Sequence, residues 1–214
     1  MAEPRSRKQI LNLSLVALVC LLAAWGIWQA QRVMRADFTA MQARYRIDGW
    51  AAGKSQWTVP AWIEARDDLL EASRIAPDNP LTFDYLAQLN ALRGRRAWEA
   101  PELRKAYFSD ALRFQKISLA LRPENGAAWA SLALGHFALE DHPAAFGALR
   151  QALRYGPYEV PVKQMAEELV LAMWAEAPAD LHAWLLQRHR DGTSDEKADI
   201  DRLAKRYGVR IQEG

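Results

Sequence analysis

Four histidines and two pairs of adjacent acids are the residues of this chain best suited to chemistry. His182 and His189 lie seven residues apart on one face of a predicted helix, with no cysteine or carboxylate beside them at metal-ligand spacing. We therefore interpret them as a solvated surface pair rather than a metal site. His136 occupies a packing position, and His142 lies at a predicted helix start.

The acid pairs Asp67-Asp68 and Glu167-Glu168 consist of neighbours in the sequence. Side chains of neighbouring residues diverge on a helix, so neither pair converges on a substrate, and we interpret both as surface charge. The sequence has no glycine-rich phosphate loop, nucleophile elbow or HExxH motif. It predicts no catalytic, cofactor-binding or metal-binding residue, and we expect the protein not to be an enzyme.

One basic cluster, Arg93, Arg95 and Arg96, is dense enough to contact an acidic polymer or a phosphate, although a solvated loop is the alternative. The other basic residues are scattered, and the formal net charge is +2 over 214 residues. A nucleic-acid partner is therefore not expected.

The elements that carry these residues are helices, and one helical hairpin is clear between residues 126 and 157. Its first helix has large residues on one face, Asp141 or His142 can cap its second helix, and Gly156-Pro157 ends it. Eight positions define the pattern: Trp129, Leu132, Ala133, His136, Ala145, Leu149, Ala152 and Pro157. This spacing resembles the tetratricopeptide repeat (TPR), with Ala133 and His136 replacing the usual glycine and tyrosine.

The alanines of this hairpin have a packing role, because two helices approach closely only where bulk is missing. We expect Ala133 and Ala145 to touch inside the hairpin, and Ala152 to meet the next unit. A second unit, from Pro77, repeats the pattern with Phe83 in the place of Trp129. The spacing from Phe83 to Trp129 exceeds the repeat period of about 34 residues by roughly 12 residues.

These extra residues surround the segment RGRRAWEAPELR, from Arg93 to Arg104, which we predict to be a loop or short helix projecting between two helices. Upstream, Ala65, Leu69 and Ala72 have the spacing of a second repeat helix. The matching first helix, residues 36–45, is poor.

Helices continue beyond Pro157 without the repeat period. Val162, Met165, Leu169 and Met173 share one helix face, Asp180 can cap another helix, Thr193 opens a capping box with Glu196, and Gly208 can end the last helix. The fold class predicted is all-α: a single N-terminal transmembrane helix, then a short TPR-like α-solenoid with atypical C-terminal capping helices. The predicted boundaries are a basic tail at 1–9, the span at 10–28, a juxtamembrane helix and linker at 29–56, and the helical domain at 57–214, with repeats at 80–123 and 126–157 and capping helices at 160–208.

The uncharged run from Ile10 to Trp28 would span about 28 Å as a helix, close to the thickness of the hydrocarbon core. A cleavable signal peptide is the alternative; the length of the run and the bulky Trp28 before Gln29-Ala30 favour an anchor in the lipid bilayer. Arg5, Arg7 and Lys8 precede the run, and a similar number of arginines follows it. The tighter leading charges favour a cytoplasmic N-terminus and a periplasmic helical domain in a bacterial inner membrane.

The concave side of such a repeat array is expected to be unusually apolar here, so the chain itself or a partner should cover it. The partner-binding candidates are Leu81, Asp84, Gln88, Ala130, Leu134 and Phe137. We expect other membrane or periplasmic proteins as partners.

The layout of one span, a short TPR domain and the junction ALRYGPYEVPV resembles the VpsP-like membrane proteins of bacterial exopolysaccharide biosynthesis. This resemblance implies an accessory role at the inner membrane in polysaccharide assembly or export, whereas the repeat alone implies protein binding. An assembly helper for cytochrome c maturation, pilus assembly or cell division is the alternative.

Overall fold

The computed structural model describes residues 7–211, with side chains from Asn12 onward, and it confirms an all-helical fold. Helices make up 82% of it, and the described part contains no strand. Residues 1–6 of the predicted basic tail lie outside the described residues. The chain forms two compact units, Met1–Asn79 and Pro80–Gly214, which are described separately below.

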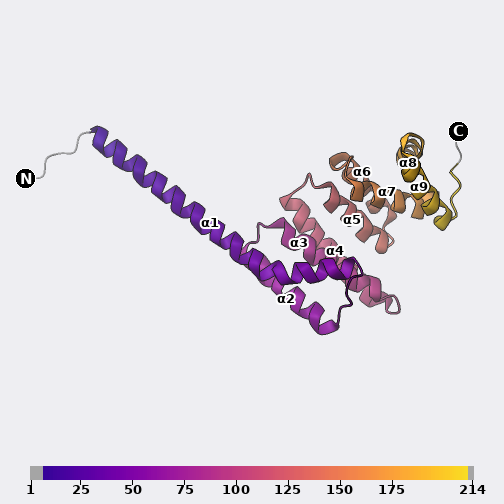
Figure 1. The fold of residues 1–214 in the computed structure, drawn as a ribbon, viewed down its shortest axis with the longest axis horizontal. Helices are drawn as coiled ribbons and strands as arrows, with labels where there is room; N and C mark the ends of the chain where they lie inside the picture. Colours follow the sequence, from indigo (N-terminus) through magenta and orange to yellow (C-terminus); the bar gives the residue numbers. More distant parts are fainter. Residues whose placement is uncertain (1–6, 212–214) are drawn as a thin grey trace, which may run out of the picture. The chain divides into compact units, whose positions relative to one another are not determined.

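Unit 1 begins with one continuous helix, α1, Arg7–Ala51 (Figure 1). The predicted span at 10–28 and the predicted juxtamembrane helix are therefore parts of a single element. Gln29, Ala30, Gln31 and Arg32, which follow the apolar run, are good helix formers, so the backbone has no reason to break there. The helix is long and apolar enough to cross a membrane, and the side chains of its apolar part are exposed, with Leu21 at 69%.

The second helix of unit 1, α2 (Val59–Ile75), packs beside α1. Thr58 caps it by accepting a hydrogen bond from the backbone N–H of Ala61. The buried small and aliphatic residues of α1 recur with a 4-3-4 spacing on one helix face: Ala36, Ala40, Ala43 and Ile47. On α2 the expected set, Ala65, Leu69 and Ala72, is fully buried. The poor first helix predicted at 36–45 is thus the packed portion of α1.

Unit 2 begins with two helical hairpins, α3 (Pro80–Arg96) with α4 (Pro101–Leu121), and α5 (Gly126–Ala138) with α6 (His142–Tyr155). The prediction of a projecting loop or short helix at residues 93–104 is wrong. Residues 93–96 lengthen α3 and residues 101–104 lengthen α4, with a turn at 97–100 between them, so α3 and α4 have 17 and 21 residues against 13 and 14 in the following pair. Glycine usually weakens a helix, but Gly94 lies inside α3, where a Cβ would come within 2.9 Å of the Phe108 ring.

The α5–α6 hairpin follows its sequence signals closely. The Asp141 side chain caps α6 by accepting from the backbone N–H of Ala144, and Glu140, at φ 62°, makes the sharp turn before it. Ala133 and Ala145 are fully buried in one core cluster. Ala152 packs with Ala130 and with Val162 of the next helix, as expected for the junction with a following unit.

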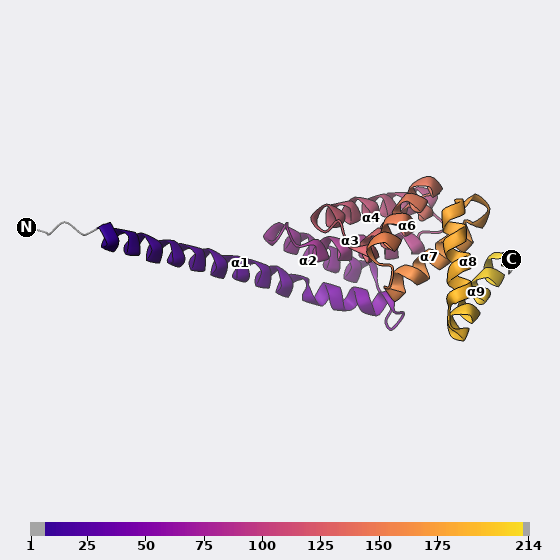
Figure 2. The same ribbon diagram turned by 90° about the horizontal axis from the view of Figure 1, so that it is seen from above.

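Three further helices and a short 3-10 turn complete unit 2: α7 (Val160–Ala172), η1 (Trp174–Glu176), α8 (Ala179–Asp191) and α9 (Ser194–Tyr207). Both α8 and α9 pack against α7 and against each other (Figure 2). Thr193 and Glu196 form the predicted capping box, and Gly208 ends α9 in the left-handed conformation at φ 68°. Asp180 is not the cap of α8; it lies in the first turn and binds Arg150.

Candidate functional site

Unit 2 contains an apolar groove bordered by α3, α4 and α5, with a volume of about 570 Å³. We call it the α3–α5 groove. Ala87 lines it from α3, together with Asp84, Gln88, Ala91 and Arg95, which are spaced four, three and four residues apart. They therefore form one stripe along the helix, which runs for about 16 Å from Asp84 to Arg95.

The apolar residues that line the groove are of two sizes, alanines and larger side chains. Alanines make much of its surface on all three helices: Ala87, Ala91, Ala111, Ala127, Ala128 and Ala138. Larger side chains, Phe108, Leu112, Leu134 and Phe137, stand among them. Leu134 and Phe137 are half-buried, packing with one part against the core cluster while another part borders the hollow. An apolar ligand surface could therefore approach the backbones closely between the bulky residues.

The two ends of the groove differ in charge. At one end Asp84 accepts a hydrogen bond from Gln115 Nε2 at 3.0 Å and forms an ion pair with Arg122. At the other end stand Arg95 of α3 and Arg104 of α4, whose guanidinium lies 5.8 Å from the centre of the Phe108 ring. One end is thus internally neutralised, and the other is cationic.

The structure brings most of the predicted partner-binding residues to this groove, but not all. Asp84, Gln88, Leu134 and Phe137 line it. Leu81 is exposed at the start of α3 and does not line it. Ala130 is 4% exposed and packs with Ala152 and Val162, because its face of α5 turns toward the following helices instead.

The three arginines of the basic cluster also separate. Arg95 reaches the groove, whereas Arg93 lies 5.7 Å from the Tyr107 ring centre and donates a 3.4 Å hydrogen bond to the Tyr107 hydroxyl. Arg96 is exposed in the last turn of α3 and does not line the groove.

Sequence reasoning missed the contribution of α4. Arg104, Phe108, Leu112 and Gln115 line the groove from this helix at spacings of four, four and three residues. The same helical periodicity would have revealed this stripe, had the helix been taken to start at Pro101 rather than after the predicted loop from Arg93 to Arg104.

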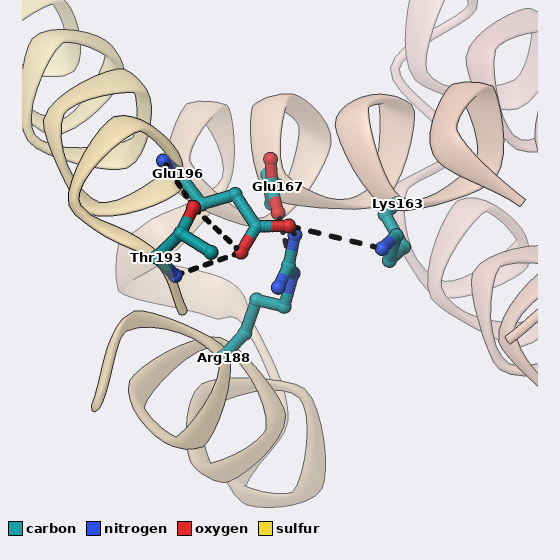
Figure 3. A network of polar contacts seen from close by, with 5 residues as sticks. All are labelled: Lys163, Glu167, Arg188, Thr193 and Glu196. Atoms are coloured by element: carbon teal, nitrogen blue, oxygen red, sulfur yellow. Dashed lines mark hydrogen bonds and ion pairs between the residues drawn. The ribbon is translucent and has the colours of Figure 1, made fainter. Parts of the chain in front are cut away.

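A second, polar cavity of about 320 Å³ lies where α7, α8 and α9 meet. Its centre is the ionic network of Figure 3. Arg188 of α8 donates from Nε to Glu167 Oε1 at 3.2 Å and from its Nη2 to Glu196, and Lys163 Nζ lies 4.0 Å from Glu196. Glu196 also accepts a 2.9 Å hydrogen bond from the backbone N–H of Thr193. The charges pair within the network, which indicates that it fastens the three helices together.

The interpretation of the Glu167-Glu168 pair as surface charge is wrong for Glu167. Glu167 is only 5% exposed, whereas Glu168 lies at the surface near Arg206 and Tyr207. Burial raises the pKa of Glu167, against the opposing charge of Arg188. The pKa of Glu196 is lowered to about 2, first by the hydrogen bond from Arg188 and then by that from Thr193.

Each of the four histidines lies within hydrogen-bond distance of a partner in unit 2. His189 is 8% exposed and its Nε2 lies 2.9 Å from Asp201 Oδ1, while His182 Nε2 donates to the Trp174 carbonyl at 2.8 Å. They are thus not the solvated pair that was predicted. His136 and His142 lie beside Asp141 and Glu176.

Within the described side chains, no three His, Cys, Asp or Glu residues gather in a way that could hold a metal ion. No family model matches the chain, and no curated protein sequence matches it significantly.

Proposed function

We propose that this protein is a membrane-anchored scaffold or adaptor, in which α1 crosses the inner membrane of a bacterium and the α3–α5 groove binds a segment of another protein. The observation that carries the proposal is the groove itself. It combines alanines, which permit close approach, with half-buried Leu134 and Phe137, whose exposed parts gain from being covered. A lining of this kind suits a packed protein surface rather than a polar reaction.

The helix packing of unit 2 supports the same role. Helices of this unit pack mainly on neighbours one or two elements away in the chain, as in stacked helical repeats. The small residues of the TPR pattern, Ala133, Ala145 and Ala152, are fully buried. Arrays of this architecture offer extended surfaces for binding proteins.

The setting we propose is envelope exopolysaccharide biosynthesis or export, on the basis of the layout of span, short repeat domain and ALRYGPYEVPV junction. The leading charges Arg5, Arg7 and Lys8 favour a periplasmic position for unit 2. An assembly helper for another envelope process, such as cytochrome c maturation, pilus assembly or cell division, is the alternative. The identity of the bound protein separates the two settings.

The direct test is site-specific photo-crosslinking in the cells that make the protein. A p-benzoylphenylalanine at the position of Ser131, an exposed residue that lines the groove, should form a discrete adduct with another protein on irradiation. The matched control is the same amino acid at Ser109, which is exposed on α4 and lines a different surface. Equal labelling at both positions, or no protein adduct at Ser131, would overturn the proposal.

A further inference from the structure

The cationic end of the α3–α5 groove is built by the part of the α3–α4 hairpin that exceeds the repeat length. Arg95 lies in the last turn of α3, and Arg104 in the first turns of α4. Both belong to the segment that the repeat period does not account for. The extension of the two helices therefore adds a feature to the groove that a hairpin of the length of α5–α6 would lack.

The two arginines differ in their surroundings from three other arginines of unit 2. Arg122, Arg150 and Arg188 each form an ion pair with a carboxylate. Among the described residues, no carboxylate lies within ion-pair distance of Arg95 or Arg104. Both side chains are exposed beside an apolar surface, so their charges remain available to a ligand.

We propose that the segment bound in the groove is an acidic amphipathic helix of a partner protein, with its carboxylates placed at Arg95 and Arg104. This inference rests on the proposed docking function and specifies the chemistry of the partner. A carboxylate at this end would accept charge-assisted hydrogen bonds from one or both guanidinium groups. The stripe from Asp84 to Arg95, about 16 Å, matches roughly three turns of a helix.

The lining also distinguishes this occupant from other acidic molecules. An extended peptide adds to a sheet edge through backbone hydrogen bonds, and the described residues contain no strand that could offer one. A polysaccharide presents hydroxyl groups, whereas most of the residues that line the groove are alanines, leucines and phenylalanines. The apolar face of a helix, with anchors at i, i+3 or i+4, and i+7, fits both the lining and the length.

The experiment uses the full-length protein in its own membranes, with p-benzoylphenylalanine at the position of Ser131. Arg95→Glu and Arg104→Glu should each lower the adduct yield about tenfold, the effect of losing one charge-assisted hydrogen bond. Lys105→Glu is the matched control, because Lys105 is an exposed neighbour of Arg104 that does not line the groove. Arg95→Lys should retain most of the yield, and sequencing of the adduct should place the crosslink in an acidic amphipathic segment.

The failures of the two proposals differ in this experiment. If Ser131 captures a protein but Arg95→Glu and Arg104→Glu behave like Lys105→Glu, the acidic-helix inference is wrong while the docking function stands. The acidic-helix inference is also wrong if the captured segment lacks carboxylates. If the adduct contains a lipid or a small anion in place of a protein, both proposals are wrong. Unchanged melting temperatures establish that each variant is folded.

Discussion

The Arg32 Nη2 atom lies 2.6 Å from Asp78 Oδ2, and this ion pair joins α1, just beyond its apolar run, to the end of unit 1. Arg32 follows Trp28 by one helical turn. The α1–α2 hairpin therefore leads away from the end of the apolar run and then returns the chain almost to its starting point. The same contact lowers the pKa of Asp78, mainly through the hydrogen bond from Arg32.

From the geometry of this hairpin we expect two exposed positions, Lys54 and Arg74, to lie at very different distances from the bilayer. From Trp28 to Ala51, α1 rises by about 35 Å, so Lys54 should lie far from the membrane surface, whereas Arg74 should lie near it. Dye-labelled Lys54→Cys and Arg74→Cys, each in a Cys20→Ser background, are compared in vesicles with acceptor dyes on the lipid headgroups. Energy transfer should be strong from position 74 and weak from position 54. Equal transfer would show that α1 bends or that α2 does not return.

Gly126 should be indispensable for the α5–α6 hairpin. A Cβ there would lie 2.6 Å from the backbone nitrogen of Gly156, and backbone cannot move aside cheaply. Gly126→Ala should therefore lower the free energy of unfolding by about 1–3 kcal/mol, measured by denaturant melts. In Gly147→Ala the new methyl meets nothing within 4 Å, so this control should gain about 0.5–1 kcal/mol from better helix propensity. Equal effects of the two substitutions would contradict the close contact.

Local signals allowed much of this fold to be predicted. Helix boundaries depend on residues only a few positions away. As their residue types predict, Asp141 and Thr193 cap helix starts, and Gly208 ends α9 in the left-handed conformation. The buried sets on α2 and α5 follow helical periodicity, which depends only on the order of apolar residues. The groove stripes on α3 and α5 follow the same rule.

The features that could not be predicted depend on contacts distant in the sequence. Glu167 looked like surface charge because its burial requires Arg188, which lies 21 residues away on another helix. The continuation of α3 through Gly94 was missed because its reason lies on the next helix. The Phe108 ring of α4 packs so close to Gly94 that a side chain there would clash with it. The continuity of α1 was missed because the end of an apolar run marks a membrane boundary without ending a helix.

The network around Arg188 predicts a specific acid sensitivity. The pKa of Glu196 falls from its ordinary 4.5 to about 2 in the folded state, so the unfolded chain takes up the proton first as the pH drops. The stability that this carboxylate contributes is complete above about pH 4.5 and is lost as the pH falls to about 2. Glu196→Gln should therefore flatten the decline of stability over this window in melts at stepped pH. The neighbouring Asp195→Asn is the control; if it flattens the decline equally, Glu196 is not the group responsible.

The proposed periplasmic position of unit 2 is tested with fusions to the C-terminus. Alkaline phosphatase folds with its disulfides only outside the cytoplasm, so the fusion should be active if the leading charges before α1 stay inside. A fluorescent protein that matures only in the cytoplasm should remain dark at the same site. The reverse pattern would place unit 2 in the cytoplasm and leave the docking function intact.

The central claim, that the α3–α5 groove is an open docking surface, is tested most directly by filling it without disturbing the core. Ala127 is exposed and lines the groove, so Ala127→Trp should occupy the hollow while leaving the buried clusters unchanged. Ala120→Trp, at an exposed position of α4 that does not line the groove, is the control.

The measurement is the yield of the protein adduct at Ser131 in membranes, read together with the melting temperature. The account predicts that Ala127→Trp abolishes the adduct with the fold retained, and that Ala120→Trp leaves both unchanged. An undiminished adduct in folded Ala127→Trp would contradict it, because the partner would then be bound somewhere other than the groove.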